Sequence, residues 1–311
     1  MAKTNCPSSP SADEIARAAA LIRQGELVAF PTETVYGLGA NALDARAVRR
    51  VFEIKGRPPA SPLIVHVSSI GMARGLAKEW PAQAEELARR YWPGPLTLVL
   101  PKTAQIPDEV TAGLPTVGIR MPAHPVALAL IESADLPIAA PSANRFSQLS
   151  PTTAEHVRQA FGGELKMILD GGPTEVGIES TVVSLVEDEP VLLRPGMIVL
   201  PGIRRAADPT EGAHASPGQH PKHYSPRTPL FLVENGAIPA AGRGVYVGWR
   251  DASRAEKSVP PPSEAHEYAA RLYSLLHELD RENWDWIAVE KPPEGPEWAA
   301  IHDRLQRAAA R

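Results

Sequence analysis

The chain has 311 residues, which is enough for about two domains of roughly 150 residues each. Hydrophobic residues make up 43% and charged residues 22%, proportions that are typical of a soluble globular protein. The formal net charge of −4 provides no overall positive field that would attract nucleic acid or an anionic membrane. A single cysteine, Cys6, excludes an internal disulfide framework and a cysteine-based zinc cage.

The first 200 residues alternate amphipathic helices with short apolar strands. Ser11 and Glu14 have the spacing of a capping box, which predicts a helix that begins there and ends at Gly25. Thr152 and Glu155 repeat this spacing before a helix predicted at 153–161. Further helices are predicted at 44–55, 83–91 and 126–133, and strands at 27–30, 63–67, 96–100, 117–120, 137–140, 167–169, 181–186 and 191–193. This interleaving predicts an α/β domain over residues 11–200.

The pattern stops at residue 201 and resumes at residue 229. Residues 201–228 are rich in Pro, Gly, His and Ser, a composition that indicates a linker. Strands are then predicted at 230–233, 245–249 and 286–289, and helices at 264–279 and 297–309. Residues 229–311 therefore form a second, small α/β domain.

Several common catalytic and binding motifs are missing from the sequence. It has no Walker-type phosphate loop, no H-E-x-x-H and no G-x-S-x-G. Gly37-Leu-Gly39-Ala-Asn-Ala42 matches a dinucleotide fingerprint, but it lies well beyond the strand end and lacks the acidic residue expected about 20 residues later. We interpret it as a tight turn with close backbone packing. His214, His220 and His223 lack a fourth metal ligand at fitting spacing, which favours solvated linker histidines.

Polar side chains gather where predicted strands and helices end. The first strand is followed by Thr32-Glu-Thr34-Val-Tyr36, and polar groups at a strand end often line a pocket, although an ST-turn would explain them too. Lys55 and Arg57 lie in a Gly/Pro-rich loop after a helix. Such cations hold phosphate oxygens, or simply stabilise the helix terminus. His66 falls inside an apolar strand, where a core or edge histidine is the ordinary interpretation.

A third set of such residues is spread along the chain. It comprises Thr116, Arg120, Ser142, Asn144, Ser147, Ser150, Ser180, Thr181 and Arg194. Each residue alone is explained by a turn or a cap. Together these small hydroxyls, an amide and arginines form hydrogen bonds and neutralise anions, but they are poor general bases.

These motifs occur together in one family. Phe30-Pro-Thr-Glu-Thr-Val-Tyr-Gly-Leu-Gly39, Lys55-x-Arg57-Pro-x-x-x-Pro62-Leu-Ile-Val-His66, Pro141-Ser-Ala-Asn144, Ser180-Thr181 and Arg194-Pro-Gly196 closely resemble the threonylcarbamoyl-AMP synthases of the YrdC superfamily. The linker ending Ser216-Pro-Gly-Gln-His-Pro-Lys-His-Tyr-Ser-Pro226 and the small last domain resemble the two-domain Sua-type members. The resemblance covers residues 11–311.

The resemblance implies a reaction and a fold. L-threonine, bicarbonate and ATP, with Mg²⁺, would give threonylcarbamoyl-AMP and pyrophosphate. The product would pass to a tRNA threonylcarbamoyl transferase for the N6-threonylcarbamoyl modification of adenosine 37. The first domain would be a YrdC-like twisted, mixed sheet around a deep, positively lined cavity, and the last domain would be Rossmann-like. The linker would lie over the cavity and exclude water. No covalent nucleophile is expected, and Lys55 and Arg57 would stabilise charge.

Site residues carry over position by position. The residues that match the family's L-threonine contacts are Thr34, His66, Arg120, Ala140 and Ser180. Those that match the ATP contacts are Lys55, Arg57, Ser61, Thr116, Ser142, Asn144, Ser150, Arg194 and Tyr224. Arg120 would pair with the amino-acid carboxylate, and Tyr224 would reach over the nucleotide. Ser61 stands where many relatives have Asn. The resemblance names no metal ligand in this chain and leaves direct tRNA binding open.

Two other functions compete with the synthase. A non-catalytic RNA-binding module could use the same basic cavity, but the negative net charge and the absence of an aromatic stacking run argue against it. Another carbamoyl-transferring enzyme with this cavity would carry zinc-finger-type cysteines, whereas this chain has only Cys6. The chain has neither a signal-peptide h-region nor an apolar run of about 18 residues, so we expect a cytoplasmic protein without a membrane span.

Overall fold

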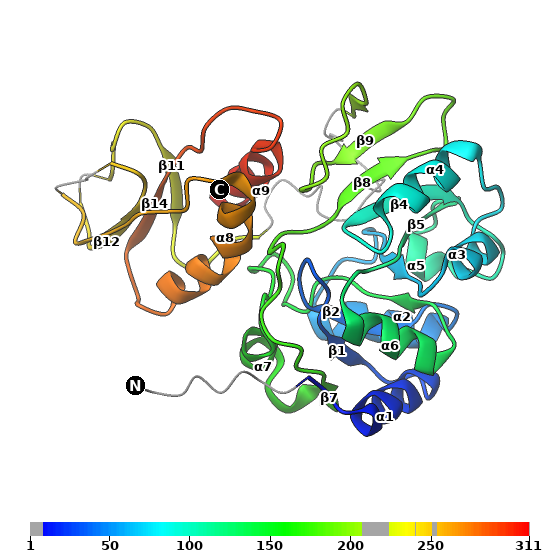
Figure 1. The fold of residues 1–311 in the computed structure, drawn as a ribbon. Coiled ribbons are helices and arrows are strands. Elements are labelled where there is room, and N and C mark those ends of the chain that lie inside the picture. Colours follow the sequence, from blue (N-terminus) through cyan, green and yellow to red (C-terminus); the bar gives the residue numbers. More distant parts are fainter. Residues whose placement is uncertain (1–8, 207–223, 240, 251–253, 311) are drawn as a thin grey trace.

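A computed structural model describes residues 9–206, 224–239, 241–250 and 254–310 of the chain. Two α/β domains lie side by side in it (Figure 1). Cys6, His214, His220, His223 and most of the predicted linker fall outside the described residues.

The N-terminal domain is built on a ten-stranded mixed sheet with the strand order β10-β9-β8-β4-β5-β3-β6-β2-β1-β7. Its strands are β1 Val28–Phe30, β2 Gly37–Asn41, β3 Ile64–His66, β4 Leu96–Pro101, β5 Thr116–Arg120, β6 Ile138–Ala139, β7 Met167–Ile168, β8 Thr181–Ser184, β9 Val191–Arg194 and β10 Arg204–Arg205. β3 pairs in parallel with β5 but antiparallel with β6, so the sheet is mixed, as predicted. β10 lies within the predicted linker range and still pairs with β9.

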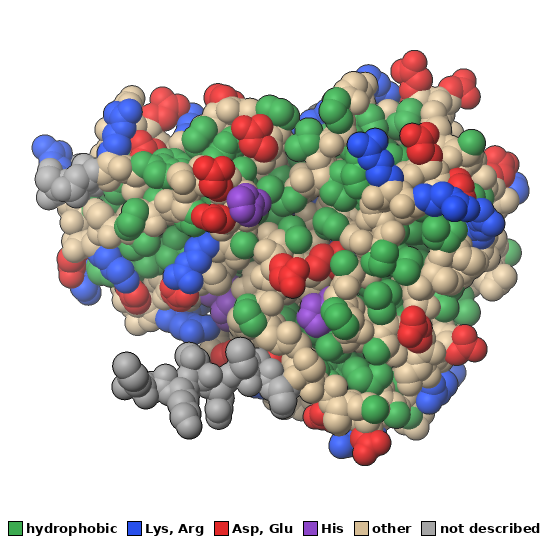
Figure 2. All heavy atoms as spheres, in the orientation of Figure 1, with side chains coloured by type: hydrophobic (Ala, Val, Ile, Leu, Met, Phe, Trp, Pro, Cys, Tyr) green, Lys and Arg blue, Asp and Glu red, His purple; other side chains and the backbone are tan. Residues whose placement is uncertain are grey.

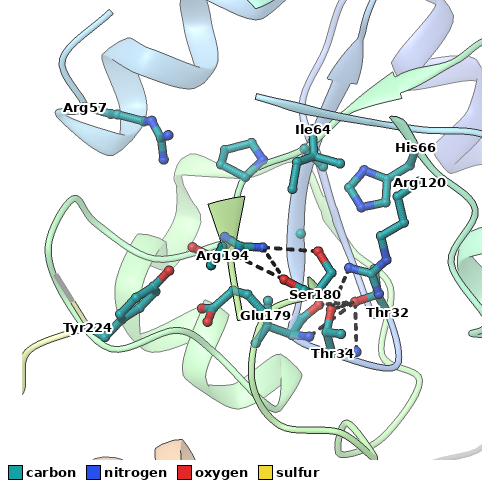
Figure 3. A pocket seen from close by; sticks show the side chains of 15 residues that line it. Thr32, Thr34, Arg57, Ile64, His66, Arg120, Glu179, Ser180, Arg194 and Tyr224 are labelled. Carbon is teal, nitrogen blue, oxygen red and sulfur yellow. Dashed lines mark hydrogen bonds between the residues drawn. The ribbon is translucent and has the colours of Figure 1, made fainter. Parts of the chain in front are cut away.

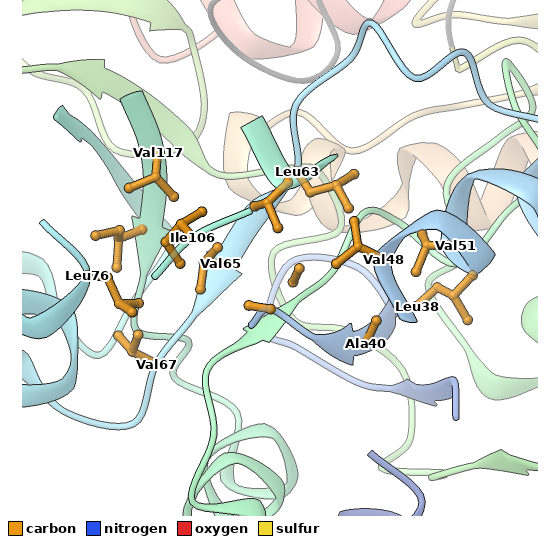
Figure 4. Packing of buried hydrophobic residues seen from close by; sticks show 14 of the residues in the cluster. Leu38, Ala40, Val48, Val51, Leu63, Val65, Val67, Leu76, Ile106 and Val117 are labelled. Carbon is orange, nitrogen blue, oxygen red and sulfur yellow. The ribbon is translucent and has the colours of Figure 1, made fainter. Parts of the chain in front are cut away.

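Helices cover the sheet on both faces. They are α1 Ala12–Arg23, α2 Ala45–Lys55, α3 Ile70–Leu76, α4 Ala82–Tyr91, α5 Asp108–Thr111, α6 Pro125–Ala134 and α7 Ala154–Phe161, followed by a 3₁₀ turn at Gly162–Glu164. Helices α1 and α6 pack with Val28, Phe30 and Ile138 in one apolar cluster. Helices α2, α3, α4 and α7 join the larger cluster on the opposite face, part of which Figure 4 shows.

Alternation along the strands separates the core from a polar face. In β3 and β5, Val65, Val117 and Ile119 enter the larger core. Their neighbours His66 and Arg120 point to the other face, because successive strand side chains alternate. On that face His66 and Arg120 line the same cavity.

Local signals explain most of the helix ends. Ser11 and Glu14 form the predicted capping box of α1, and Gly56 ends α2 in the left-handed conformation, with φ +62°. The prediction of Thr152 as the cap of α7 is wrong. Thr153 caps this helix by accepting a hydrogen bond from His156 N, while Thr152 bonds the imidazole of His156. Two adjacent threonines offer equivalent caps, so the sequence alone does not distinguish them.

The interpretation of Gly37-Leu-Gly39-Ala-Asn-Ala42 as a tight turn is wrong. Gly37–Asn41 is the strand β2, paired with β1 and β6. The close packing predicted for its glycines is present: a Cβ on Gly39 would lie 2.8 Å from Phe30 Cε1 and 2.9 Å from Ile138 Cγ2. A glycine is therefore required at position 39 because strand β2 passes close to the Phe30 ring, and not because the backbone there is left-handed.

The C-terminal domain carries a four-stranded, all-parallel sheet of order β11-β14-β12-β13. Its elements are β11 Leu230–Val233, β12 Gly244–Val247, β13 Lys257–Val259, α8 Ala265–Asp280, β14 Trp286–Glu290 and α9 Ala299–Ala309. The parallel sheet, with α8 as the crossover helix between β13 and β14, agrees with the Rossmann-like expectation, although β13 was not predicted. Helices α8 and α9 lie on the side of this sheet that faces the N-terminal domain (Figure 1).

The described residues lack a membrane-spanning helix and a cluster of metal-ligating side chains. None of the helices combines the length and apolarity that a membrane crossing requires. The described residues also contain no group of three or more His, Cys, Asp or Glu side chains that could hold a metal ion.

The close contact at Gly39 predicts a stability effect. We expect Gly39→Ala to lower the free energy of unfolding by about 1–3 kcal/mol, since Phe30 and Ile138 must move to admit the methyl group. The control is Gly75→Ala in α3, where a Cβ would meet no atom within 4 Å and the helix gains up to about 1 kcal/mol. Urea unfolding of both variants measures this, and equal stability of the two would contradict the account.

Candidate active site

A cavity opens on the polar face of the N-terminal sheet. It encloses about 530 Å³ of space, part of it open to solvent. Its lining consists of Thr32, Thr34, Val35, Gly37, Arg57, Ile64, His66, Arg120, Ala140, Pro141, Ser142, Glu179, Ser180, Arg194 and Tyr224. Three arginines and one carboxylate line the walls, which makes the cavity cationic, as expected (Figure 3).

Arg120 is held at the end of β5 by three partners. Its Nη1 donates to Thr34 Oγ1 at 2.9 Å, and its Nε donates to Gly94 O at 3.3 Å. Its Nη2 lies 2.8 Å from Glu33 Oε1, and both side chains of this ion pair are buried. Glu33 thus balances the charge of Arg120 inside the protein, and the Thr34 hydroxyl lies directly beside the guanidinium.

His66 lies on β3 beside Arg120 in the parallel register of the two strands. The imidazole is buried and meets the Phe30 ring edge-on, with centroids 6.1 Å apart. Burial and the nearby Arg120 lower the pKa of His66 to about 3, so the ring is neutral at physiological pH. Its Nδ1 has no hydrogen-bond partner among the described residues. A neutral imidazole with an unpartnered nitrogen suits a substrate hydroxyl or amine.

Ser180 is fixed from two sides. Arg194 Nε and Nη2 donate to its carbonyl oxygen at 3.1 and 3.0 Å, and Nη2 also reaches Ser180 Oγ at 3.1 Å. The hydroxyls of Thr97 and Ser180 are 2.8 Å apart. The start of β8 thereby becomes a rigid part of the cavity wall.

Arg57 and Lys55, which were predicted together, lie differently. The Arg57 guanidinium lines the cavity and donates to Pro62 O at 3.2 Å, and burial lowers its pKa to about 10, so it stays a cation at neutral pH. Lys55 does not line the cavity. Its Nζ donates to the carbonyl oxygens of Ser142 and Asn144 and so supports the loop that presents Ser142.

The remaining predicted residues divide into two groups. Ala140, Ser142 and Tyr224 line the cavity. Thr116 borders a narrow neighbouring space, Asn144 lines a second cavity between the two domains, and Ser150 bonds Glu179 behind the wall. Ser61 is buried but is not among the lining residues.

The sequence prediction missed one charged residue of the wall, Glu179. It directly precedes Ser180, so its position at the same strand end was the available signal. The prediction also missed Arg304 of the C-terminal domain, whose Nε lies 2.7 Å from Glu179 Oε2. The only signal for Arg304 was a charge on the apolar face of a predicted helix.

Comparison with known proteins defines the class of both domains. A family model described as "Telomere recombination" (Sua5_yciO_yrdC) matches residues 20–196. The model "Threonylcarbamoyl-AMP synthase, C-terminal domain" matches residues 183–310. The chain thus combines a YrdC-type domain with the C-terminal domain of the two-domain synthases, as the resemblance implied.

Individual relatives extend over nearly the whole chain. The threonylcarbamoyl-AMP synthase of Pyrococcus abyssi is 44% identical over 94% of this chain and 93% of its own length. That of Bacillus subtilis is 43% identical over 95% and 93%. The crystal structure of P. abyssi Sua5 complexed with L-threonine matches with a TM-score of 0.91 at 41% identity, covering 97% of this chain and 96% of that one. The chain belongs to the threonylcarbamoyl-AMP synthase family.

The buried state of His66 predicts a pH dependence. The pKa is about 3 in the folded protein and near 6.5 when unfolded, so the unfolded chain binds more protons between these values. We therefore expect His66 to lower the free energy of unfolding as pH falls below about 6.5. An NMR titration of the folded protein should show no inflection for His66 between pH 5 and pH 8. A midpoint near 6.5 would contradict a buried, neutral ring.

Proposed function

We propose that this chain is an L-threonylcarbamoyladenylate synthase, a nucleotidyltransferase that forms threonylcarbamoyl-AMP and pyrophosphate from L-threonine, bicarbonate and ATP. The observation that carries the proposal is the cavity itself. It combines three arginines with small hydroxyls and a neutral imidazole, in a chain of this family. This set binds and neutralises anions without a nucleophile of its own.

The reaction needs no covalent bond to the protein. Bicarbonate loses hydroxide to give CO₂, and the threonine amine attacks its carbon. The C–N bond forms as one C=O π bond opens, and the proton lost from nitrogen joins the hydroxide as water, which leaves a carbamate. A carbamate oxygen then attacks the α-phosphorus of ATP, an O–P bond forms, and the bond to the β-phosphate breaks to release pyrophosphate. The protein contributes by holding the reactants together and by stabilising the charge on the phosphates.

L-threonine would occupy the inner part of the cavity. The relative from P. abyssi was solved in complex with L-threonine, which supports a threonine site in this fold. Here Arg120 Nη1 donates to Thr34 Oγ1 at 2.9 Å, and His66 and Ser180 line the same cavity. Arg120 would receive the carboxylate of the amino acid, while Thr34, His66 or Ser180 would bind its hydroxyl or amine.

ATP would lie toward Arg57, Arg194 and Tyr224, which line the cavity. The planar guanidinium group of an arginine can donate two parallel hydrogen bonds to phosphate oxygens, and the buried Tyr224 ring would contact the adenine base. Lys55 and Asn144 would support this region through the loop at Ser142. The assignments of Ser61, Thr116 and Ser150 to the nucleotide remain predictions.

Mg²⁺ would enter as the MgATP complex. Glu179 is the one carboxylate among the cavity-lining residues, and it is already bonded to Arg304. Phosphate oxygens and water are the usual partners of this ion, so we assign no protein ligand to it.

The product would leave for a tRNA threonylcarbamoyl transferase, and we expect the enzyme to work in the cytoplasm. On the face shown in Figure 2, basic and acidic side chains are mixed and do not form a continuous basic stripe among the described residues. The RNA-binding alternative therefore finds no support on that face.

Pyrophosphate release tests the proposal. The purified chain should release pyrophosphate from MgATP only when L-threonine and bicarbonate are both present, and release should fail when serine replaces threonine. Release of pyrophosphate when L-threonine or bicarbonate is left out would contradict the proposed reaction. Salt-dependent RNA binding without any turnover would favour the RNA-binding module.

Arg120 gives a sharper prediction for the threonine site. The double variant Arg120→Gln/Glu33→Gln removes the ion pair without leaving a lone buried charge. We expect it to raise KM for L-threonine roughly 10- to 100-fold, as loss of a hydrogen bond to a charged group costs about 1.5–3 kcal/mol. KM for ATP should stay within about threefold. The control is Arg46→Gln, whose exposed side chain lies on α2. Equal increases in KM for L-threonine and in KM for ATP would contradict the assignment of Arg120 to the threonine site.

A further inference from the structure

A buried ion pair joins the C-terminal domain to the cavity wall. Arg304, on α9, is fully buried, and its Nε donates to Glu179 Oε2 at 2.7 Å. Glu179 belongs to the N-terminal domain and lines the cavity (Figure 3). A residue of the second domain thus contacts the back of the wall that the substrates would face.

Glu179 is held by hydroxyl groups from both domains. Ser150 Oγ donates to its Oε1 at 2.6 Å, and the phenol of Tyr273 on α8 donates to its Oε2 at 3.1 Å. Burial alone would raise the pKa of Glu179, but Arg304 and Arg194 hold it below its ordinary value. Glu179 is therefore a carboxylate anion fixed in one orientation.

Arg304 is itself locked in place. Its Nη2 donates to Pro195 O at 3.2 Å, and its Nη1 donates to Asp303 at 2.6 Å. Its guanidinium carbon lies 5.2 Å from the centre of the Tyr224 ring, within the range of a cation–π contact. The guanidinium touches two neighbours of the cavity besides Glu179, namely the backbone beside Arg194 and the ring of Tyr224.

The charge of Glu179 opposes the proposed ligand. A triphosphate in this cavity would meet a fixed carboxylate, and like charges in a buried site repel strongly. Arg304 is fully buried, is not among the residues that line the cavity, and offsets this charge through its ion pair with Glu179. The wall can then accept an anion while Glu179 keeps its contacts with Ser150 and Tyr273.

We propose that Arg304 is a positioning residue of the nucleotide site, through which the C-terminal domain neutralises and orients Glu179. This inference rests on the proposed function, because it takes ATP as the anion that the wall must accept. The C-terminal domain then contributes to the reaction electrostatically, through the charge of Arg304. Arg304 itself touches no substrate.

The test compares three variants of the full chain: Arg304→Met, Glu179→Gln, and the two combined. Arg304→Met removes the ion-pair partner of Glu179 and leaves its negative charge in the wall, and we expect KM for ATP to rise at least about tenfold with a smaller change in kcat. The double variant has no carboxylate to neutralise, so its KM for ATP should return to within about threefold of the unsubstituted protein. A purely structural role of Arg304 would not be rescued by a change at Glu179.

Arg205→Met is the matched control. Arg205 bonds Asp303 in the same network at 2.9 Å, but Glu179 is not among its partners in the described structure. We expect its KM for ATP to stay within about twofold. Circular dichroism and urea unfolding check that each variant is folded.

Two results would overturn the inference. One is a double variant with KM for ATP no lower than that of Arg304→Met. The other is loss of activity in Glu179→Gln alone, since the carboxylate would then act directly. If Arg304→Met does not fold, the comparison is made between Glu179→Gln and the double variant. A tenfold difference in KM for ATP between these two variants contradicts the inference.

ATP binding by calorimetry separates this inference from the proposed function. If the unsubstituted chain binds ATP without turnover, the proposed function fails, while the same comparison of ATP affinities among the variants still tests Arg304.

Discussion

The site depends on one constraint: its charged side chains are buried, where water does not solvate them. Arginines in a cavity wall cannot rely on solvent, so each needs a fixed partner inside the protein. Arg120 has Glu33 and Thr34, and Arg194 has the carbonyl and hydroxyl of Ser180. Because these partners hold the guanidinium groups in place, little reorganisation remains when an anion arrives. Preorganised charge is the chief contribution that a protein can make to a reaction among three anionic or neutral reactants.

The sheet makes this arrangement possible. Strands β3 and β5 place alternate residues in the core, and the residues between them, His66 and Arg120, reach the cavity. Gly39 lets β2 approach Phe30 closely, and Phe30 in turn meets the His66 ring. The packing of apolar residues thus fixes the polar face. The C-terminal domain contacts this wall from behind, through the ion pair between Arg304 and Glu179.

Much of this structure could be predicted because its signals are local. The capping box at Ser11 and the apolar strands define elements over a few residues. The resemblance to a known family then named nine residues that line the cavity, Thr34, Arg57, His66, Arg120, Ala140, Ser142, Ser180, Arg194 and Tyr224. Strand β2 was missed because two glycines resemble a turn when their cross-strand contacts are unknown. The position of Lys55 behind the wall, and the pairing of Glu179 with Arg304, depend on contacts between residues far apart in the sequence. No local pattern reveals such contacts.

The central claim is that this cavity joins three small molecules into one adenylate. The most direct test is to supply ¹³C-labelled bicarbonate with L-threonine and MgATP and to analyse the products by mass spectrometry. The account predicts an adenylate that contains threonine and a single ¹³C atom, formed together with pyrophosphate. An adenylate of threonine without the label, or no adenylate at all, would contradict it.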